Sequence, residues 1–105
     1  MNKKKETTIN RVKTALFQID EEASIFLFGS RAMNAANEGS DWDFLFLTSS
    51  PVTISLRKKI VKKMLPIELS ENILIQVIPK NKMEWEAKYA VTPLYKNIKR
   101  EGIAL

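Results

Sequence analysis

The chain has 105 residues, a length that fits one domain with a single hydrophobic core, and we expect that domain to span residues 1–105. It contains no cysteine and no histidine, so disulfides, thiolate metal sites and imidazole chemistry are excluded, and only carboxylates remain for metal binding. A hydrophobic content of 45%, a net charge of +5 and a sequence pI near 9.6 indicate a globular protein with an anionic partner: a nucleotide, RNA or an acidic protein surface.

The N-terminal segment, Met1 to Glu6, is charged and lacks the apolar region of a secretory signal. No apolar run approaches the roughly 18 residues of a membrane span. We therefore expect a cytoplasmic protein that has no membrane partner.

A first amphipathic helix is predicted from Thr7 or Thr8, either of which can cap it, to about Glu22. Its apolar residues recur at helical spacing: Ile9, Val12, Leu16 and Ile19. The apolar run 24–28 follows as the first strand, and residues 31–36 are predicted to form a short helix. A helix start at that point would present free N–H groups to an anion.

Small polar residues and a pair of acids follow the first strand. The strand ends at Gly29-Ser30, and ten residues later Asp41 and Asp43 open a second apolar run, 44–47. Residues two apart on a strand point to the same face, with Cα atoms about 6.6 to 6.8 Å apart. Two neighbouring carboxylates repel each other, and a divalent cation that bridges to a substrate phosphate would relieve the repulsion. The other face of the same strand takes Trp42, Phe44 and Phe46.

The turn before the acids has the groups needed to hold a phosphate. Gly29 permits a close backbone approach, Ser30 offers a hydroxyl and a backbone N–H, and Arg31 adds a permanent positive charge. Taken singly, Gly29-Ser30 is an ordinary turn and Asp41 an ordinary strand terminus. Together these residues indicate a nucleoside triphosphate held through Mg²⁺ or Mn²⁺.

This pattern of Gly-Ser, ten residues and Asp-x-Asp resembles the signature of the minimal nucleotidyltransferases of the DNA polymerase beta superfamily. The resemblance covers most of the chain and is strongest between Ile25 and Leu47. The flanks that also match are the Phe26-Leu27-Phe28 strand, Arg31-Ala32 after the serine, and Gly39-Ser40 before the first acid.

The next predicted element is a helix capped by Thr53 and ended by Pro66. Its buried stripe is expected to contain Leu56, Ile60, Val61 and Met64. Between these residues lies a dense basic face: Arg57, Lys58, Lys59, Lys62 and Lys63. This face is interpreted mainly as a solvated surface, with docking of RNA or an acidic protein as the alternative; little aromatic interleaving supports RNA.

Residues 72–78 are predicted to form a third strand that Pro79 stops, and its continuous apolar character favours a central position, buried on both faces. In the family that the chain resembles, a third acid commonly lies on this strand, and Gln76 is the best candidate for its counterpart. An amide oxygen can coordinate Mg²⁺, but it adds no negative charge and cannot act as a general base. Glu68 and Glu71 are possible substitutes.

Two C-terminal helices are predicted, over residues 82–90 and about 93–101, the second with Thr92 as N-cap and Gly102 as the stop. Their aromatic and aliphatic residues are expected to pack a core: Trp85, Tyr89, Leu94, Tyr95 and Ile98. The element order predicts an α/β (α+β) domain with a small mixed β-sheet covered by helices. The resemblance implies the same architecture, a polymerase-beta-like nucleotidyltransferase fold.

The resemblance implies an enzyme that transfers a nucleoside monophosphate, AMP from ATP, to an acceptor hydroxyl. Asp41 and Asp43 would act as catalytic metal ligands together with Gln76, while Gly29, Ser30 and Arg31 hold the phosphates. Minimal nucleotidyltransferases are commonly encoded beside a small helical HEPN protein, with which they form antitoxin–toxin pairs. Two alternatives remain: a weak or inactive protein that binds nucleotide or partner, and an RNA-binding module.

Overall fold

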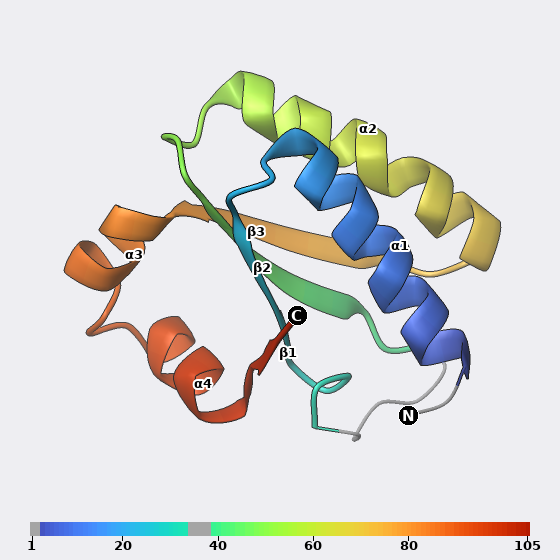
Figure 1. Ribbon diagram of the computed structural model, residues 1–105. Coiled ribbons are helices and arrows are strands. Elements are labelled where there is room, and N and C mark those ends of the chain that lie inside the picture. The colour runs from blue at the N-terminus through green and yellow to red at the C-terminus, as the bar shows by residue number, and fades with distance from the viewer. Residues whose placement is uncertain (1–2, 34–38) are drawn as a thin grey trace.

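The computed structural model describes residues 3–33 and 39–105, with side chains from residue 5 onward, as a four-stranded sheet between two pairs of helices (Figure 1). The sheet has the order β3-β2-β1-β4. The elements along the chain are α1 (Lys3–Ile19), β1 (Ser24–Phe28), β2 (Trp42–Thr48), α2 (Ile54–Glu71), β3 (Ile75–Asn81), α3 (Lys82–Lys88), α4 (Pro93–Glu101) and β4 (Ile103–Ala104).

The alternation of β2 divides the core into two layers. Its odd and even residues point to opposite faces of the sheet. Trp42, Phe44 and Phe46 pack with the buried stripes of α1 and α2, whereas Leu45 and Leu47 pack with Trp85 and Ile98 of α3 and α4. β2 is thus covered on both sides, which its nearly continuous apolar sequence requires.

The sheet is mixed, because β2 pairs antiparallel with β1 and parallel with β3. The parallel pair is joined by α2, which provides the long crossover that such pairing needs. β4 pairs antiparallel with the other side of β1, and the N–H of Leu105 donates to the carbonyl of Ile25 at 2.9 Å. The predicted fold class, a small mixed sheet covered by helices, is confirmed.

The predicted third strand is present, but its position was wrong. β3 begins at Ile75, runs through Pro79 and forms an edge of the sheet. The central strand is β2. Proline has no N–H to donate, and an edge strand tolerates it because one side of its backbone needs no strand partner. Apolar character alone could not distinguish this half-covered edge from a central strand.

The helix boundaries also differ from expectation. α1 begins at Lys3 and ends at Ile19, so Thr8 lies buried inside the helix and does not cap it. α2 is capped as predicted, since Thr53 accepts a hydrogen bond from the N–H of Leu56. Pro66 does not end α2; it lies on the exposed side of the helix, where water can satisfy the carbonyl that its missing N–H leaves unpaired.

α2 instead ends at Asn72, whose left-handed backbone (φ 54°) closes the helix with an N–H bond to the carbonyl of Glu68. Val61, predicted to be buried, is 64% exposed. The C-terminal helices form where expected, with Thr92 as N-cap, and Trp85 and Ile98 are buried. Residues 31–33 form a turn, and the rest of the predicted short helix lies outside the described residues. In the part of the chain that the structure describes, no helix is both long and apolar enough to cross a membrane.

Candidate functional site

The candidate site lies where β1 ends and β2 begins, because antiparallel pairing places Phe28 beside Asp43. The next residue, Gly29, has φ +75°, a conformation that side chains other than glycine rarely adopt. A Cβ on Gly29 would lie only 2.5 Å from Oδ2 of Asp43. The chain therefore uses a glycine to let its backbone approach the carboxylate, and Ser30 follows directly in the same turn, which the N–H of Ala32 closes on the carbonyl of Gly29 at 3.1 Å.

The two acids form an electrostatically costly pair. Asp41 is exposed just before β2, and Asp43 is half-buried within it. Burial, followed by the negative charge of Asp41, raises the pKa of Asp43 above its ordinary value. Within residues 3–33 and 39–105, no group donates a hydrogen bond to either carboxylate. The described residues thus leave the negative charge of the pair without a hydrogen-bond donor.

Gln76 lies directly beside Asp43. The parallel pairing of β2 with β3 puts these two residues in register, so their side chains share the face of the sheet that α3 and α4 cover only in part. Gln76 is exposed. The structure therefore brings together Gly29, which directly follows β1, Asp43 of β2 and Gln76 of β3, with Asp41 at the margin.

Glu68 and Glu71 are both engaged elsewhere. The carboxylate of Glu68 accepts a hydrogen bond from the N–H of Ile75 at 2.9 Å, which fixes the turn from α2 into β3. Glu71 pairs with Arg11 at 2.8 Å and accepts a hydrogen bond from the hydroxyl of Thr8. These contacts tie α2 to its neighbours, and no group of three or more acids that could hold a metal occurs among the described residues.

Arg31 is held by the protein itself. Its guanidinium stacks over the indole of Trp42, with Cζ 4.5 Å from the ring centroid, and donates to the carbonyl of Ser40 at 2.9 Å. Lys5 donates to the Arg31 carbonyl at 2.7 Å. Because the indole belongs to the α1–α2 side of the sheet, Arg31 braces the turn from the face opposite to Asp43.

Sequence reasoning missed this bracing role. Trp42 was expected only to fill the core opposite the acids, and Lys5 was not considered. The short spacing of Arg31, Ser40 and Trp42 across one loop was the available signal, because a loop that returns to its starting point brings its two ends together.

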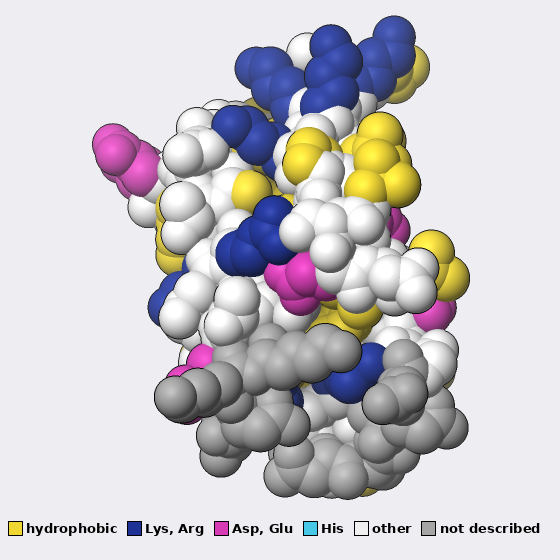
Figure 2. Space-filling model, turned by 90° about the vertical axis from the view of Figure 1, so that its right-hand side faces the viewer, with side chains coloured by type: hydrophobic (Ala, Val, Ile, Leu, Met, Phe, Trp, Pro, Cys, Tyr) yellow, Lys and Arg dark blue, Asp and Glu magenta, His cyan; other side chains and the backbone are white. Residues whose placement is uncertain are grey.

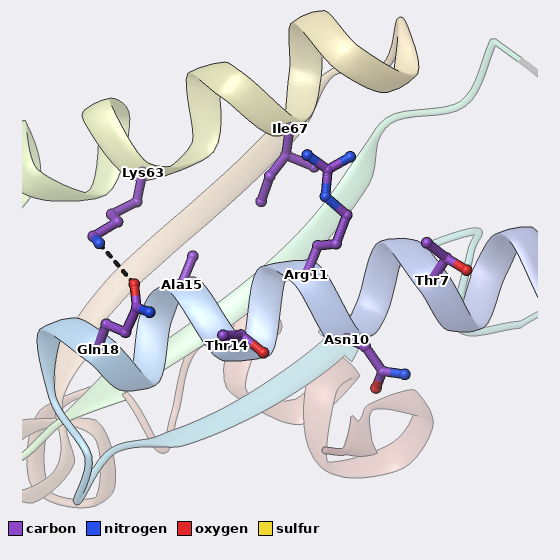
Figure 3. A pocket seen from close by; sticks show the side chains of 8 residues that line it. All are labelled: Thr7, Asn10, Arg11, Thr14, Ala15, Gln18, Lys63 and Ile67. Atoms are coloured by element: carbon purple, nitrogen blue, oxygen red, sulfur yellow. Dashed lines mark hydrogen bonds between the residues drawn. The ribbon is translucent and has the colours of Figure 1, made fainter.

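The surface also has a groove of about 560 Å³ between α1 and α2 (Figure 3). Gly29, Asp43 and Gln76 do not line it. Its two cations are already occupied: Lys63 donates to the side chain of Gln18 at 2.7 Å, and Arg11 pairs with Glu71. The remaining lining residues are Thr7, Asn10, Thr14, Ala15 and Ile67. The groove is open, and its cations already bind protein groups. It is therefore a weaker candidate for a ligand site than the site at the end of β1 and the start of β2, here called the strand-end site.

Residues 9–105 match the family described as the nucleotidyltransferase domain. The chain belongs to this family. The predicted recognition as a nucleotidyltransferase is thereby confirmed. No curated protein sequence matches the chain.

Two solved structures share the fold of this nucleotidyltransferase domain. One, described as a toxin–antitoxin with AMP-PNP, has a TM-score of 0.66 and 18% identity, covering 90% of this chain and 69% of that one. The other, described as a mutant of the toxin–antitoxin MntA–HpeT, has a TM-score of 0.61 and 14% identity, covering 99% and 72%. At these identities the likeness establishes the architecture.

The donor set of this nucleotidyltransferase domain suits a hard divalent cation. Asp41 and Asp43 offer carboxylate oxygens that accept no hydrogen bond from the residues that the structure describes, and Gln76 can add a neutral amide oxygen. Burial and the charge of Asp41 both raise the pKa of Asp43, and a bound cation would favour its ionised form. Like charges that repel each other in the absence of a ligand are typical of functional sites.

Proposed function

We propose that this chain transfers AMP from ATP to a hydroxyl group of a helical HEPN-type partner, with Mg²⁺ or Mn²⁺ as cofactor. The observation that carries the proposal is the uncompensated pair Asp41 and Asp43 against the backbone of Gly29. A stabilising structural role would require hydrogen-bond donors or cations near these carboxylates, and the described residues provide none.

Each part of the site has a role in this proposal. Asp41, Asp43 and the amide of Gln76 would hold the metal, while Gly29 and Ser30 would present backbone and hydroxyl groups to the phosphates. Arg31, although it stacks on Trp42, lies in the same turn and would contribute charge. A bound divalent cation would stabilise the charge that develops on the attacking and leaving oxygens.

The proposed transfer is a single displacement. The acceptor oxygen bonds to the α-phosphorus of ATP, the bond from that phosphorus to the bridging oxygen breaks, and pyrophosphate leaves. The hydroxyl proton would pass to water, because the chain has no histidine, Gln76 cannot accept it, and Asp41 and Asp43 would be engaged with the cation. The protein would orient the phosphates and hold the carboxylates of Asp41 and Asp43 in fixed positions for the cation.

The choice of nucleotide and partner draws support from the two solved structures. Both are toxin–antitoxin assemblies, and one contains AMP-PNP, an analogue of ATP. The other carries two aspartates, two residues apart, that are replaced by glutamate, which is the spacing of Asp41 and Asp43. The HEPN character of the partner rests on the resemblance of the sequence motif.

A second candidate function is a protein that binds nucleotide or partner without efficient turnover. The observation that favours it is the neutral Gln76 at the position beside Asp43. With two formal negative charges, the site would hold a second cation weakly. Binding would then survive while transfer is slow.

The test is incubation of the purified chain with α-labelled ATP and Mg²⁺ or Mn²⁺, with and without a candidate HEPN protein. Label on the acceptor that depends on metal and disappears in the Asp41→Asn/Asp43→Asn variant supports the enzyme. Metal-dependent ATP binding without labelling, with either cation and any acceptor, supports the second candidate. Nucleotide binding that ignores both metal and the double substitution contradicts both.

A further inference from the structure

α2 has an apolar stripe on its outer side in addition to the one that packs on the core. Val61, Leu65 and Leu69 follow at intervals of four residues and are 64%, 49% and 74% exposed. The inner stripe, with Ile60, Met64 and Ile67, is buried. Since residues four apart lie on one side of a helix, the exposed side chains form a continuous ridge, here called the outer ridge.

Cations without partners flank the outer ridge. Figure 2 shows Lys and Arg side chains gathered at the top of the molecule, over α2, beside exposed hydrophobic groups. None of these cations on α2 forms an ion pair within the described part of the chain: Arg57, Lys58, Lys59 and Lys62. The two acids of α2 do not balance them, because Glu68 binds the N–H of Ile75 and Glu71 binds Arg11.

This arrangement is unfavourable for an isolated helix. Cations near a helix N-terminus oppose the helix dipole, and the first turn of α2 contains no acid. A row of exposed aliphatic residues is also unfavourable in water. Local conflicts of this kind, in a helix whose opposite face already packs normally, are typical of a surface that a partner covers.

We propose that the outer ridge docks an amphipathic helix of a partner protein whose apolar stripe is flanked by Asp and Glu. The spacing of Val61, Leu65 and Leu69 matches the anchors of helix–helix recognition. Unpaired cations on the flanks select acidic groups on the partner and raise its association rate.

Other occupants fit less well. A second copy of this chain would bring the same cations together without an acid on the ridge to meet them. RNA would leave the exposed leucines in water, and the ridge has no aromatic side chain on which bases could stack. A membrane surface calls for a broad apolar face with bulky aromatic groups, and this ridge is narrow and aliphatic.

The outer ridge is separate from the strand-end site. α2 packs on the side of the sheet that carries Trp42 and Phe44, whereas Asp43 points to the other side. A partner helix on α2 would leave the acids accessible. The inference therefore stands without the proposed transfer, and either can fail alone.

The experiment measures binding to a fluorescent helical peptide of about 20 residues, with a leucine stripe flanked by glutamate, by anisotropy at low salt. A second peptide carries lysine in place of glutamate. We expect saturable binding of the first peptide, weaker by about tenfold or more in the Leu65→Ser/Leu69→Ser variant and in Lys58→Glu/Lys62→Glu, and weakened by salt. The lysine peptide should not bind.

Matched controls separate the ridge from general stickiness and charge. Met83→Ser and Val91→Ser remove comparably exposed apolar groups of the α3–α4 region, and Lys88→Glu/Lys96→Glu makes the same change of charge there; all should bind the peptide like the parent. Thermal melts establish that every variant is folded. Equal binding of both peptides, no binding, or equal losses in ridge and control variants would overturn the proposal.

Three further measurements test the other occupants. Size-exclusion chromatography should show a monomer; a dimer that Leu65→Ser dissociates assigns the ridge to a second copy. Single-stranded RNA or anionic vesicles that bind more tightly than the acidic peptide, and lose binding on Leu65→Ser/Leu69→Ser, would assign it to those classes. Any of these results contradicts the proposed helical partner.

Discussion

The two ends of the β1–β2 pair carry carboxylates in opposite circumstances. At the end where β1 begins, Asp20 accepts a bond from the N–H of Ser49 at 2.8 Å and from its hydroxyl at 2.9 Å, and another from the N–H of Glu22. At the end where β1 stops, Asp43 receives no hydrogen bond from the described residues and faces Asp41. The same sheet thus places one acid among donors and another beside a second acid.

The pKa values follow this difference. Burial raises the pKa of Asp20, but the hydrogen bonds from Ser49 and Glu22 and the charge of Lys82 outweigh it, and the net shift is downward. Burial and the charge of Asp41 raise the pKa of Asp43. Ionised Asp20 stabilises the fold, whereas ionised Asp43 opposes it, so the first end is built for stability and the second has the character expected of the proposed metal site.

The strongest test of this contrast is substitution at each end. Asp41→Asn/Asp43→Asn should abolish metal-dependent nucleotide binding and lower transfer by about 100-fold or more, because both charged ligands are lost. Its melting temperature should stay the same or rise, since the repulsion is removed. Asp20→Asn is the matched control and should keep nucleotide binding. A double variant that binds ATP and Mg²⁺ like the parent would remove the proposed site.

Substitution of Gln76 by aspartate sharpens the same contrast, because it adds a negative charge beside Asp43. Gln76→Asp should raise transfer by at least about tenfold, because an acid beside Asp43 can hold a second cation and accept a proton. Labelled ATP measures the gain, and Mn²⁺ should exceed Mg²⁺ in the parent. If Gln76→Asp gains nothing while Glu68→Gln or Glu71→Gln abolishes transfer, the third ligand has been misplaced.

Gly29→Ala tests how closely the backbone must approach the carboxylate. The new methyl would need φ +75° and would lie 2.5 Å from Asp43, so we expect a loss of about 1–3 kcal/mol in unfolding free energy together with weaker metal binding. Denaturant titration and metal-dependent fluorescence measure the two effects. Gly102→Ala is the control, because its new methyl would meet the carbonyl of Ile98, away from the acids. This variant should be less stable than the parent and should bind metal with the same affinity.

Sequence patterns placed the glycine turn and the acids at one strand end, but they gave the wrong central strand for the sheet. The turn and the acids were identifiable because Gly29, Asp41 and Asp43 are close in sequence, and strand alternation fixes the side of the sheet that Asp43 faces. Gln76 does lie beside Asp43, because β3 follows β2 through one crossover helix and pairs with it in parallel, and its role as a third metal ligand stays a prediction. Whether these residues carry out transfer stays a prediction.

Features that depend on neighbours distant in sequence could not be predicted. β3 lies at the edge because β2 pairs with both β1 and β3, and β4, a two-residue strand without a sequence signal of its own, extends the sheet on the other side of β1. The continuation of α2 through Pro66 depends on which side of the helix meets the core, and so does the exposure of Val61. Arg31 was assigned to phosphate, and its contact with Trp42 required the fold of the loop.

Asp20 tests the structural end of the comparison. Asp20→Asn should lower the free energy of unfolding by about 1 kcal/mol, because the amide keeps one acceptor but loses the charge that strengthens its bonds. Denaturant titration at neutral pH measures the loss. Ser49→Ala, which removes only the hydroxyl donor, should cost less; a neutral result for both would show that this end is not held by Asp20.

The pH dependence of stability separates the two ends with the smallest effect. Asp43 has a raised pKa in the folded protein, so the folded state binds more protons than the unfolded state between 3.8 and that pKa, and stability falls as pH rises through this window. Asp20 has a lowered pKa in the folded protein, so the stability that its ionised form contributes is present above pH 3.8 and is lost as the pH falls toward that lowered pKa.

Without metal, Asp43→Asn should therefore gain stability relative to the parent as pH rises from about 3 to 7, whereas Asp20→Asn should lose stability relative to the parent over the same range. Denaturant titrations across that range measure both differences. Parallel pH profiles for the two variants would show that the acids share one environment and that the contrast is wrong.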